Sequence, residues 1–523
     1  MESNRVWSTY QQAGIRDAQE GSGHTVFVAR AGSGKSTLQE ELVCHVPQGS
    51  KVLVCAFNTE IKEAFKEREE RILARRPDLA GRGGLEIKTV CGLGLSVCSY
   101  AFKNIKVDKY KAFDQAEVLV PGDEFRAYRS LLVKITGLAK GFLVDKLDDA
   151  CRLVANKFDL EIALLRAGFD PEKTTEEQEQ IAIRTTAKDM LALMTASKAD
   201  TSRVDFDDMW WFPIVLNLRG WGYDRIFVDE AQDLCYCQVQ LIKKMIKQRG
   251  RICAVGDPMQ VIYEFRGTTA DMLDIIIREL RAKVLPLSIT YRNARLIVEL
   301  AKSAVDDFTA RPGAPDGILE RIETNEYEAV YDLAKPGDFV VSRKNAPLLS
   351  LCIGFLKRGI PSIVRGRKDV AEVFLSLIDR SKAKTLESLL AWVDKWEARE
   401  VKRLTKKDPD ADTSSATDTA EAIRVLASDV EEVSEIRSKV ELLFTDGDDK
   451  RRVVLTSTHK AKGLERERVI MLDDTYRPSC GGEELRLWYV AVTRAKDALY
   501  LVRNEKKKTK RAERKALAQV AEQ

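Results

Sequence analysis

A glycine-rich segment near the N-terminus has the residue types that bind a triphosphate. In Val26–Thr37 (VFVARAGSGKST) an apolar run leads into a turn and then into a helical pattern that begins near Lys35. Gly32 and Gly34 can direct backbone N–H groups toward phosphate oxygens, Lys35 supplies a positive charge, and the Ser36 hydroxyl suits Mg²⁺. We therefore predict a nucleotide-binding loop. Its residues are Ala31, Gly32, Ser33, Gly34, Lys35, Ser36 and Thr37.

Two adjacent carboxylates, Asp229 and Glu230, follow another apolar run at Arg225–Val228. We predict that Asp229 holds Mg²⁺ and that Glu230 polarises the attacking water, although such a pair can also cap a helix. After a third apolar run, Gln260 is long enough to reach a γ-phosphate or its water. Together these segments predict a nucleoside triphosphatase. By themselves they do not separate a kinase, a transporter ATPase and a motor.

These segments must be brought together by strands, and the sequence contains two sets of short β-branched runs. The first set is Thr25–Ala29, Lys51–Cys55, Glu86–Val90, Arg225–Val228 and Arg251–Val255. The second set is Asp338–Val341, Pro361–Val364, Arg452–Thr456, Arg468–Leu472 and Leu499–Val502. Turns and helical patterns follow the runs, which is typical of βαβ units. The sequence therefore predicts an α/β protein with two parallel sheets.

Two mainly helical stretches interrupt the predicted sheets. We predict a first, ATP-binding lobe from 1–94 and 206–280, with a helical insertion at 95–205. The second lobe is predicted from 281–367 and 451–503, with a smaller helical insertion at 368–450. That insertion includes an acidic, Ser/Thr-rich stretch at 408–422, which is typical of a mobile linker. A basic tail at 504–523 either contacts a phosphate backbone or is a solvated helix.

The composition excludes several other classes of protein. The chain has 523 residues, of which 44% are hydrophobic and 32% charged, as in ordinary globular proteins. It has no apolar run near the roughly 20 residues of a membrane span and no signal-peptide pattern. The 10 scattered cysteines and 3 histidines argue against a disulfide framework and a His-rich metal site. We expect an intracellular protein, cytoplasmic or, in a eukaryote, nuclear.

The order of the motifs resembles the UvrD/Rep-like branch of superfamily 1 DNA helicases, and within it the group of the F-box DNA helicases. The motifs are those at 29–37, 55–59, 88–93, 205–209, 229–233, 256–267, 290–293, 458–465 and 489–496. The resemblance implies two RecA-like P-loop lobes with ATP and Mg²⁺ between them, and movement along single-stranded DNA, 3′ to 5′. No F-box is recognisable, and we expect neither an F-box nor an attached nuclease.

The resemblance also implies further nucleotide contacts. Arg292 and Arg494 match arginines that contact the γ-phosphate, and a guanidinium suits this role because it offers several donors. Gln12, or its neighbour Gln11, matches a glutamine that binds adenine, and the doublet leaves the choice open. Two positions that match the surroundings of the nucleotide sugar are Gly463 and Glu465.

The DNA path implied by the resemblance includes aromatic side chains that stack on bases, although each could instead pack in a core. The predicted contacts are Phe57, Asn58, Thr89, Tyr263, Phe265, Arg266 and His459. The expected partners are single-stranded DNA and tailed duplex DNA, with no membrane. We expect a monomer that works with replication or repair proteins. Our main interpretation is an ATP-dependent helicase. The alternative is a DNA-stimulated ATPase that strips proteins from, or senses, single-stranded DNA without unwinding duplex.

Overall fold

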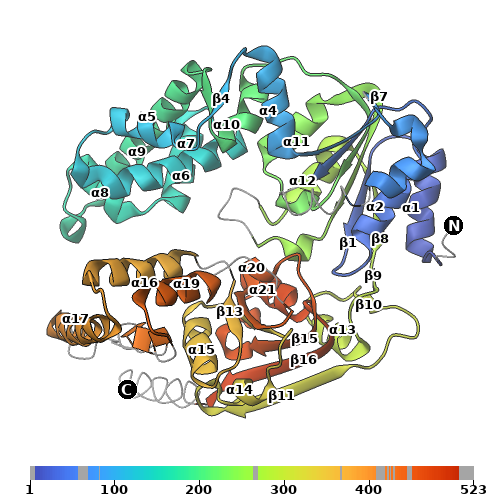
Figure 1. Cartoon of the computed structure of the whole chain (residues 1–523). Coiled ribbons are helices and arrows are strands. Elements are labelled where there is room, and N and C mark those ends of the chain that lie inside the picture. Colours follow the sequence, from blue (N-terminus) through green and yellow to red (C-terminus); the bar gives the residue numbers. More distant parts are fainter. Residues whose placement is uncertain are drawn as a thin grey trace, which may run out of the picture. The chain divides into compact units, whose positions relative to one another are not determined.

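A computed structural model describes most of the chain, which divides into two compact units, Met1–Ile289 and Thr290–Gln523 (Figure 1). The described residues are 6–56, 67, 69–81, 83–262, 269–365, 368–407, 419–420, 423–424, 426–427, 430–443 and 450–505. Most of the predicted linker at 408–422 and nearly all of the predicted tail at 504–523 lie outside these residues.

The first unit contains a parallel sheet with the strand order β3-β2-β6-β7-β1-β8. In that order the strands are Leu85–Thr89, Val52–Ala56, Tyr223–Val228, Ile246–Gly256, Thr25–Ala29 and Lys283–Leu287. The accompanying helices are α1 (Thr9–Glu20), α2 (Lys35–Cys44), α4 (Val90–Ala101), α10 (Phe206–Val215), α11 (Tyr236–Lys244) and α12 (Met272–Leu280). All residues of β2 are buried, as expected for an inner strand covered by helices on both faces.

A bundle of helices is inserted into this unit between α4 and α10 (Figure 1). The helices are α5 (Lys111–Leu119), α6 (Arg126–Phe142), α7 (Leu147–Lys157), α8 (Leu160–Ala167) and α9 (Glu176–Ala199). A short parallel ladder joins the two ends of the insertion, because β4 (Lys106–Val107) pairs with β5 (Arg203–Val204). The sequence analysis did not predict this ladder, since two-residue strands leave no periodic pattern.

The second unit contains a parallel sheet with the order β11-β16-β15-β12-β14-β13. In that order the strands are Ile318–Thr324, Ala495–Asn504, Arg466–Leu472, Phe339–Ser342, Val453–Ser457 and Ser362–Val364. The short strands β9 (Ile289–Thr290) and β10 (Thr309–Ala310) pair with each other. The helices are α13 (Arg295–Ala301), α14 (Ala329–Leu333), α15 (Ala346–Lys357), α16 (Lys368–Ser381), α17 (Leu386–Lys407), α19 (Val433–Leu443), α20 (Thr458–Ala461) and α21 (Gly482–Val492).

The prediction of an α/β protein with two parallel sheets is confirmed, and each predicted run overlaps a strand. The strands that were not predicted include β8 and β11, which lie at sheet edges. Charged residues interrupt β11, and the apolar run of β8 contains Pro286, a residue confined to edge strands and strand ends, so neither has the pattern of an inner strand. Because β8 pairs with β1, the first unit extends to Ile289, beyond the boundary predicted at 280. None of the described helices has the length and low charge needed to cross a membrane.

Candidate active site

The glycine-rich loop connects β1 to α2, as its sequence predicts. Gly32 and Gly34 have φ angles of 66° and 79°, in the left-handed region that glycine adopts without strain. Gly34 is also the N-cap residue of α2, so the free N–H groups of that helix begin at the loop. The Ser33 hydroxyl is buried and has no hydrogen-bond partner among the described residues. These features fit the binding of an anion at the loop.

Asp229 and Glu230 follow β6 at the carboxyl edge of the same sheet. Asp229 is 3% exposed, and its Oδ2 accepts a hydrogen bond from Ser36 Oγ over 3.5 Å. Its Oδ1 accepts from the Glu230 N–H over 2.9 Å. A hydroxyl and a carboxylate are the oxygen ligands that Mg²⁺ prefers beside phosphates, so the Ser36 and Asp229 side chains fit this ion.

The structure joins the two halves of the predicted site through Lys35 and Glu230. Lys35 Nζ lies 3.0 Å from Glu230 Oε1 and 3.2 Å from Oε2. Burial lowers the pKa of Lys35, but the negative charges of Glu230, Asp257 and Asp229 outweigh this effect and raise it. Lys35 is therefore a permanent cation at the loop.

A further carboxylate, Asp257, belongs to this site and was not predicted. It follows β7 and is 0% exposed. Its N–H donates to Gln232 Oε1 over 3.0 Å, and Gln232 Nε2 donates to Glu230 Oε2 over 2.6 Å. Gln260 Nε2 donates to Asp257 Oδ2 over 2.8 Å. Burial raises the pKa of Asp257. Its position directly after a buried strand, like that of Asp229, was the signal that could have identified it.

The structure brings Gln11, and not Gln12, to the loop. Gln12 is exposed, and its amide donates to the Trp7 carbonyl over 3.0 Å. Gln11 is 5% exposed, and a Cβ on Gly34 would lie 3.1 Å from Gln11 Nε2. Gln11 also caps α1, because its Oε1 accepts from the Ser8 N–H. The two side chains diverge because neighbouring residues of a helix face different directions, so of the two it is the Gln11 side chain that lies beside the loop.

In the second unit, Arg292 and Glu465 lie together. They form an ion pair over 2.5 Å, and Lys496 Nζ lies 3.1 Å from the other Glu465 oxygen. Burial raises the pKa of Glu465, but Arg292 and Lys496 outweigh this effect and lower it. Gly463, two residues before Glu465, has a φ of 85°. The cluster thus contains one carboxylate, Glu465, between two cations, Arg292 and Lys496.

Arg494 has a different environment. Arg494 is only 1% exposed. The guanidinium donates from Nε to the Val490 carbonyl over 2.8 Å and from Nη1 to the Leu464 carbonyl over 3.0 Å. These bonds anchor Arg494 between α21 and the turn that precedes β15. The two backbone carbonyls thus fix the position of the guanidinium.

Among the predicted DNA contacts, the structure describes Thr89 and His459. Thr89 is the N-cap residue of α4, and its Oγ1 accepts from the Gly92 N–H over 3.0 Å. His459 lies on α20 and is partly buried. The predicted contacts outside the described residues are Phe57, Asn58, Tyr263, Phe265 and Arg266.

Comparison with known proteins gives two family matches. The model of the UvrD/REP helicase N-terminal domain matches residues 8–279, and that of the UvrD-like helicase C-terminal domain matches residues 365–506. F-box DNA helicase 1 of Gallus gallus is 25% identical over 316 residues, which are 54% of this chain and 29% of that protein.

Two bacterial proteins show a similar level of identity. The ATP-dependent DNA helicase Rep of Escherichia coli (strain K12) is 26% identical over 296 residues, which are 54% of this chain and 41% of Rep. The ATP-dependent DNA helicase PcrA of Bacillus subtilis (strain 168) is 23% identical over 331 residues, 59% of this chain and 41% of PcrA. The matched part thus spans less than half the length of these relatives.

Proposed function

The chain belongs to the UvrD/REP helicase family, and from this premise we propose that it is an ATP-dependent DNA helicase that moves 3′ to 5′ on single-stranded DNA. The observation that carries the proposal is the meeting of Lys35 and Ser36 with Glu230 and Asp229 at one edge of a parallel sheet. Such an edge is where ligands bind in open α/β sheets. The polarity rests on the motif order alone.

In the proposed reaction, the residues of the first unit bind the triphosphate and activate water. The loop N–H groups and Lys35 bind the phosphates, and Glu230 accepts a proton from the attacking water. Ser36 and Asp229 would hold Mg²⁺, which neutralises charge on the phosphate oxygens when bound. Gln232 orients the Glu230 carboxylate by its hydrogen bond.

Other residues are proposed to complete the nucleotide contacts. Gln11 would bind the adenine, since its side chain lies beside Gly34. Arg292 and Arg494 would stabilise the negative charge that develops on the γ-phosphate. Gln260, which donates a hydrogen bond to Asp257, would change its contacts depending on whether the γ-phosphate is present.

The second part of the proposal is contact with DNA. Thr89 and His459 are proposed to contact the sugar-phosphate backbone, which requires no base sequence and therefore suits a protein that moves along a strand. Thr89 is the N-cap residue of α4, so the free N–H groups of the first turn of α4 lie next to it and could donate to phosphate oxygens as well.

Strand displacement tests this function. The purified full chain is incubated with ATP and Mg²⁺ on duplexes with a 3′ tail, a 5′ tail or no tail, beside Lys35→Ala as a control. We expect displacement of the 3′-tailed duplex only, and none with Lys35→Ala. ATP turnover that single-stranded DNA does not stimulate would overturn the proposal. Stimulated turnover without displacement of any duplex would favour a translocase that does not unwind DNA.

A further inference from the structure

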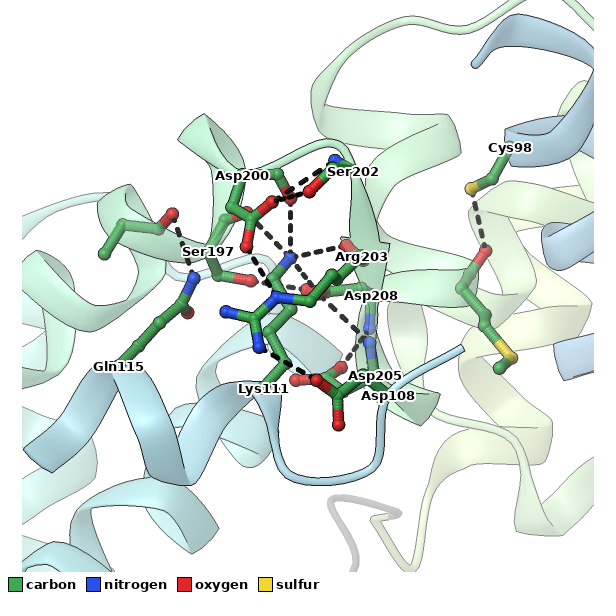
Figure 2. A network of polar contacts seen from close by, with 12 residues as sticks. Cys98, Asp108, Lys111, Gln115, Ser197, Asp200, Ser202, Arg203, Asp205 and Asp208 are labelled. Atoms are coloured by element: carbon green, nitrogen blue, oxygen red, sulfur yellow. Dashed lines mark hydrogen bonds and ion pairs between the residues drawn. The ribbon is translucent and has the colours of Figure 1, made fainter. Parts of the chain in front are cut away.

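A buried cluster of charges joins the helical insertion to α10 (Figure 2). Asp208, in the first turn of α10, is 0% exposed. Its two oxygens accept hydrogen bonds from Lys111 Nζ and Lys140 Nζ, each over 2.7 Å. Ser197 Oγ donates to Asp208 Oδ1 over 2.7 Å as well. These three donors come from α5, α6 and α9, so three helices of the insertion converge on one carboxylate.

The remaining polar groups of the cluster are also satisfied. Lys111 Nζ also lies 3.0, 2.9 and 2.9 Å from the carbonyl oxygens of Ser197, Asp200 and Arg203, in the segment that leads back toward α10 (Figure 2). Its three N–H groups are therefore shared among these oxygens and Asp208. Asp205 Oδ1 accepts from the Asp208 N–H over 2.7 Å and caps α10. Buried charges with this many partners hold the surrounding elements in one arrangement, because the loss of a charged partner weakens the pairing of the buried charges that remain.

Helix α10 is in turn packed closely against two helices of the sheet. A Cβ on Gly94 of α4 would lie 2.0 Å from the Met209 carbonyl, so only glycine permits this approach. The Cys98 thiol of α4 donates to the same carbonyl over 3.8 Å. The Cys237 thiol of α11 donates to the Trp210 carbonyl over 3.5 Å. Any displacement of α10 would therefore shift the packing of both α4 and α11.

One of these helices begins at a proposed DNA contact, and the other follows the proposed site of ATP hydrolysis. Helix α4 begins at its cap Thr89, a proposed DNA contact, and α11 follows the acidic turn that holds Glu230. We propose that Asp208 is a positioning residue through which the insertion fixes α10 between α4 and α11, so that DNA at the start of α4 raises the rate of ATP hydrolysis at the acidic turn. This inference rests on the proposed function.

Two variants of the cluster test the inference in the full chain. Asp208→Asn weakens both lysine contacts, and Lys140→Met removes one cation while Asp208 keeps its bond to Lys111. We expect the ATPase rate at saturating oligo-dT to fall about 2- to 30-fold, the range for contacts that carry coupling. The rate without DNA and the KM for ATP stay close to the wild-type values. If Asp208→Asn does not fold, Lys140→Met decides.

Asp189→Asn is the matched control. Asp189 on α9 accepts from Tyr128 OH of α6 over 2.8 Å and from Arg166 Nε of α8 over 3.1 Å, so it stabilises the insertion from within. We expect this variant to lower the Tm while DNA stimulation persists.

Two results would overturn the inference. One is unchanged stimulation in both Asp208→Asn and Lys140→Met. The other is loss of stimulation in all three variants in proportion to the loss of Tm, because the cluster would then act only through stability. A wild-type chain that DNA does not stimulate would fail at an earlier step and overturn the proposed function itself.

Discussion

Lys35 and Glu230 form an ion pair over 3.0 Å although they are 195 positions apart in the chain. The phosphate-binding lysine and the proposed base therefore share one electrostatic environment. Phosphate oxygens at the loop would compete with Glu230 for the ammonium, and this competition would leave the carboxylate available to water. Triphosphate binding and activation of the base are thus linked through a single ion pair.

Glu230→Gln should separate nucleotide binding from hydrolysis. The amide keeps the shape of the side chain but cannot accept the proton, so kcat should fall about 10²- to 10⁴-fold. ATP binding should persist, because Lys35 is released to the phosphates. Steady-state ATPase and nucleotide-binding measurements check both points. Glu86→Gln is the control, since Glu86 also pairs with a lysine, Lys88, but on β3; it should turn over ATP normally. Normal turnover by Glu230→Gln would refute the assignment of the base.

Gln11→Ala should reduce the preference for ATP over GTP, whereas Gln12→Ala should not. The reason is that Gln11 lies beside Gly34 and Gln12 is exposed. Because Gln11 also caps α1, Ser8→Ala serves as the control. This variant removes a capping hydrogen bond of the same helix, at a cost of about 0.5–2 kcal/mol, but keeps the Gln11 side-chain amide. The KM values for both nucleotides decide. An equal change in Ser8→Ala and Gln11→Ala would attribute the effect to the helix.

Arg494→Gln should lower ATP turnover by roughly 10³- to 10⁵-fold, as loss of an arginine finger does. The variant also loses the bonds to the Val490 and Leu464 carbonyls, so a second buried arginine is needed for comparison. Arg466 is 8% exposed and lies over the Phe339 ring. Arg466→Gln should destabilise the second unit with a much smaller change in kcat. If Arg494→Gln and Arg466→Gln had the same Tm and lost turnover to a similar extent, the role of Arg494 would be structural.

Asp207 should make stability depend on pH. Burial, together with the charges of Asp205 and Asp208, raises the pKa of Asp207 from 3.8 to about 6, although Lys140 opposes the change. The folded chain therefore holds this proton more tightly than the unfolded chain. The stability that it contributes is present below about pH 4 and is lost as the pH rises through 6.

Asp207→Asn removes this dependence. We expect the variant to be more stable than the wild type by about 1–2 kcal/mol near pH 8, a value reduced for the solvent screening of a half-buried group. The gain should disappear near pH 4. Chemical denaturation at both pH values measures it, and a gain that is equal at both would contradict the raised pKa.

Local sequence patterns were enough to predict much of the fold. The inner strands β1 and β2 are apolar on both faces, so each appears as a continuous run that needs no knowledge of its neighbours. The nucleotide loop is also local, because Gly32, Gly34 and Lys35 lie within one turn. The edge strands β8 and β11 were missed, since Pro286 interrupts the apolar run of β8 and charged residues interrupt β11.

What the sequence by itself determined is therefore the strands, the loop and the order of the motifs, all of which are properties of adjacent residues. Only the tertiary structure decided which polar side chains are buried and what they meet. The sequence does not indicate that Lys111 pairs with Asp208, and the two become a buried ion pair because folding of the insertion brings these distant parts of the chain together. Asp257 is linked to Glu230 through Gln232, and Gln11 rather than Gln12 lies beside the loop, for the same physical reason: burial and partners depend on how elements pack, which residue type and local spacing do not encode.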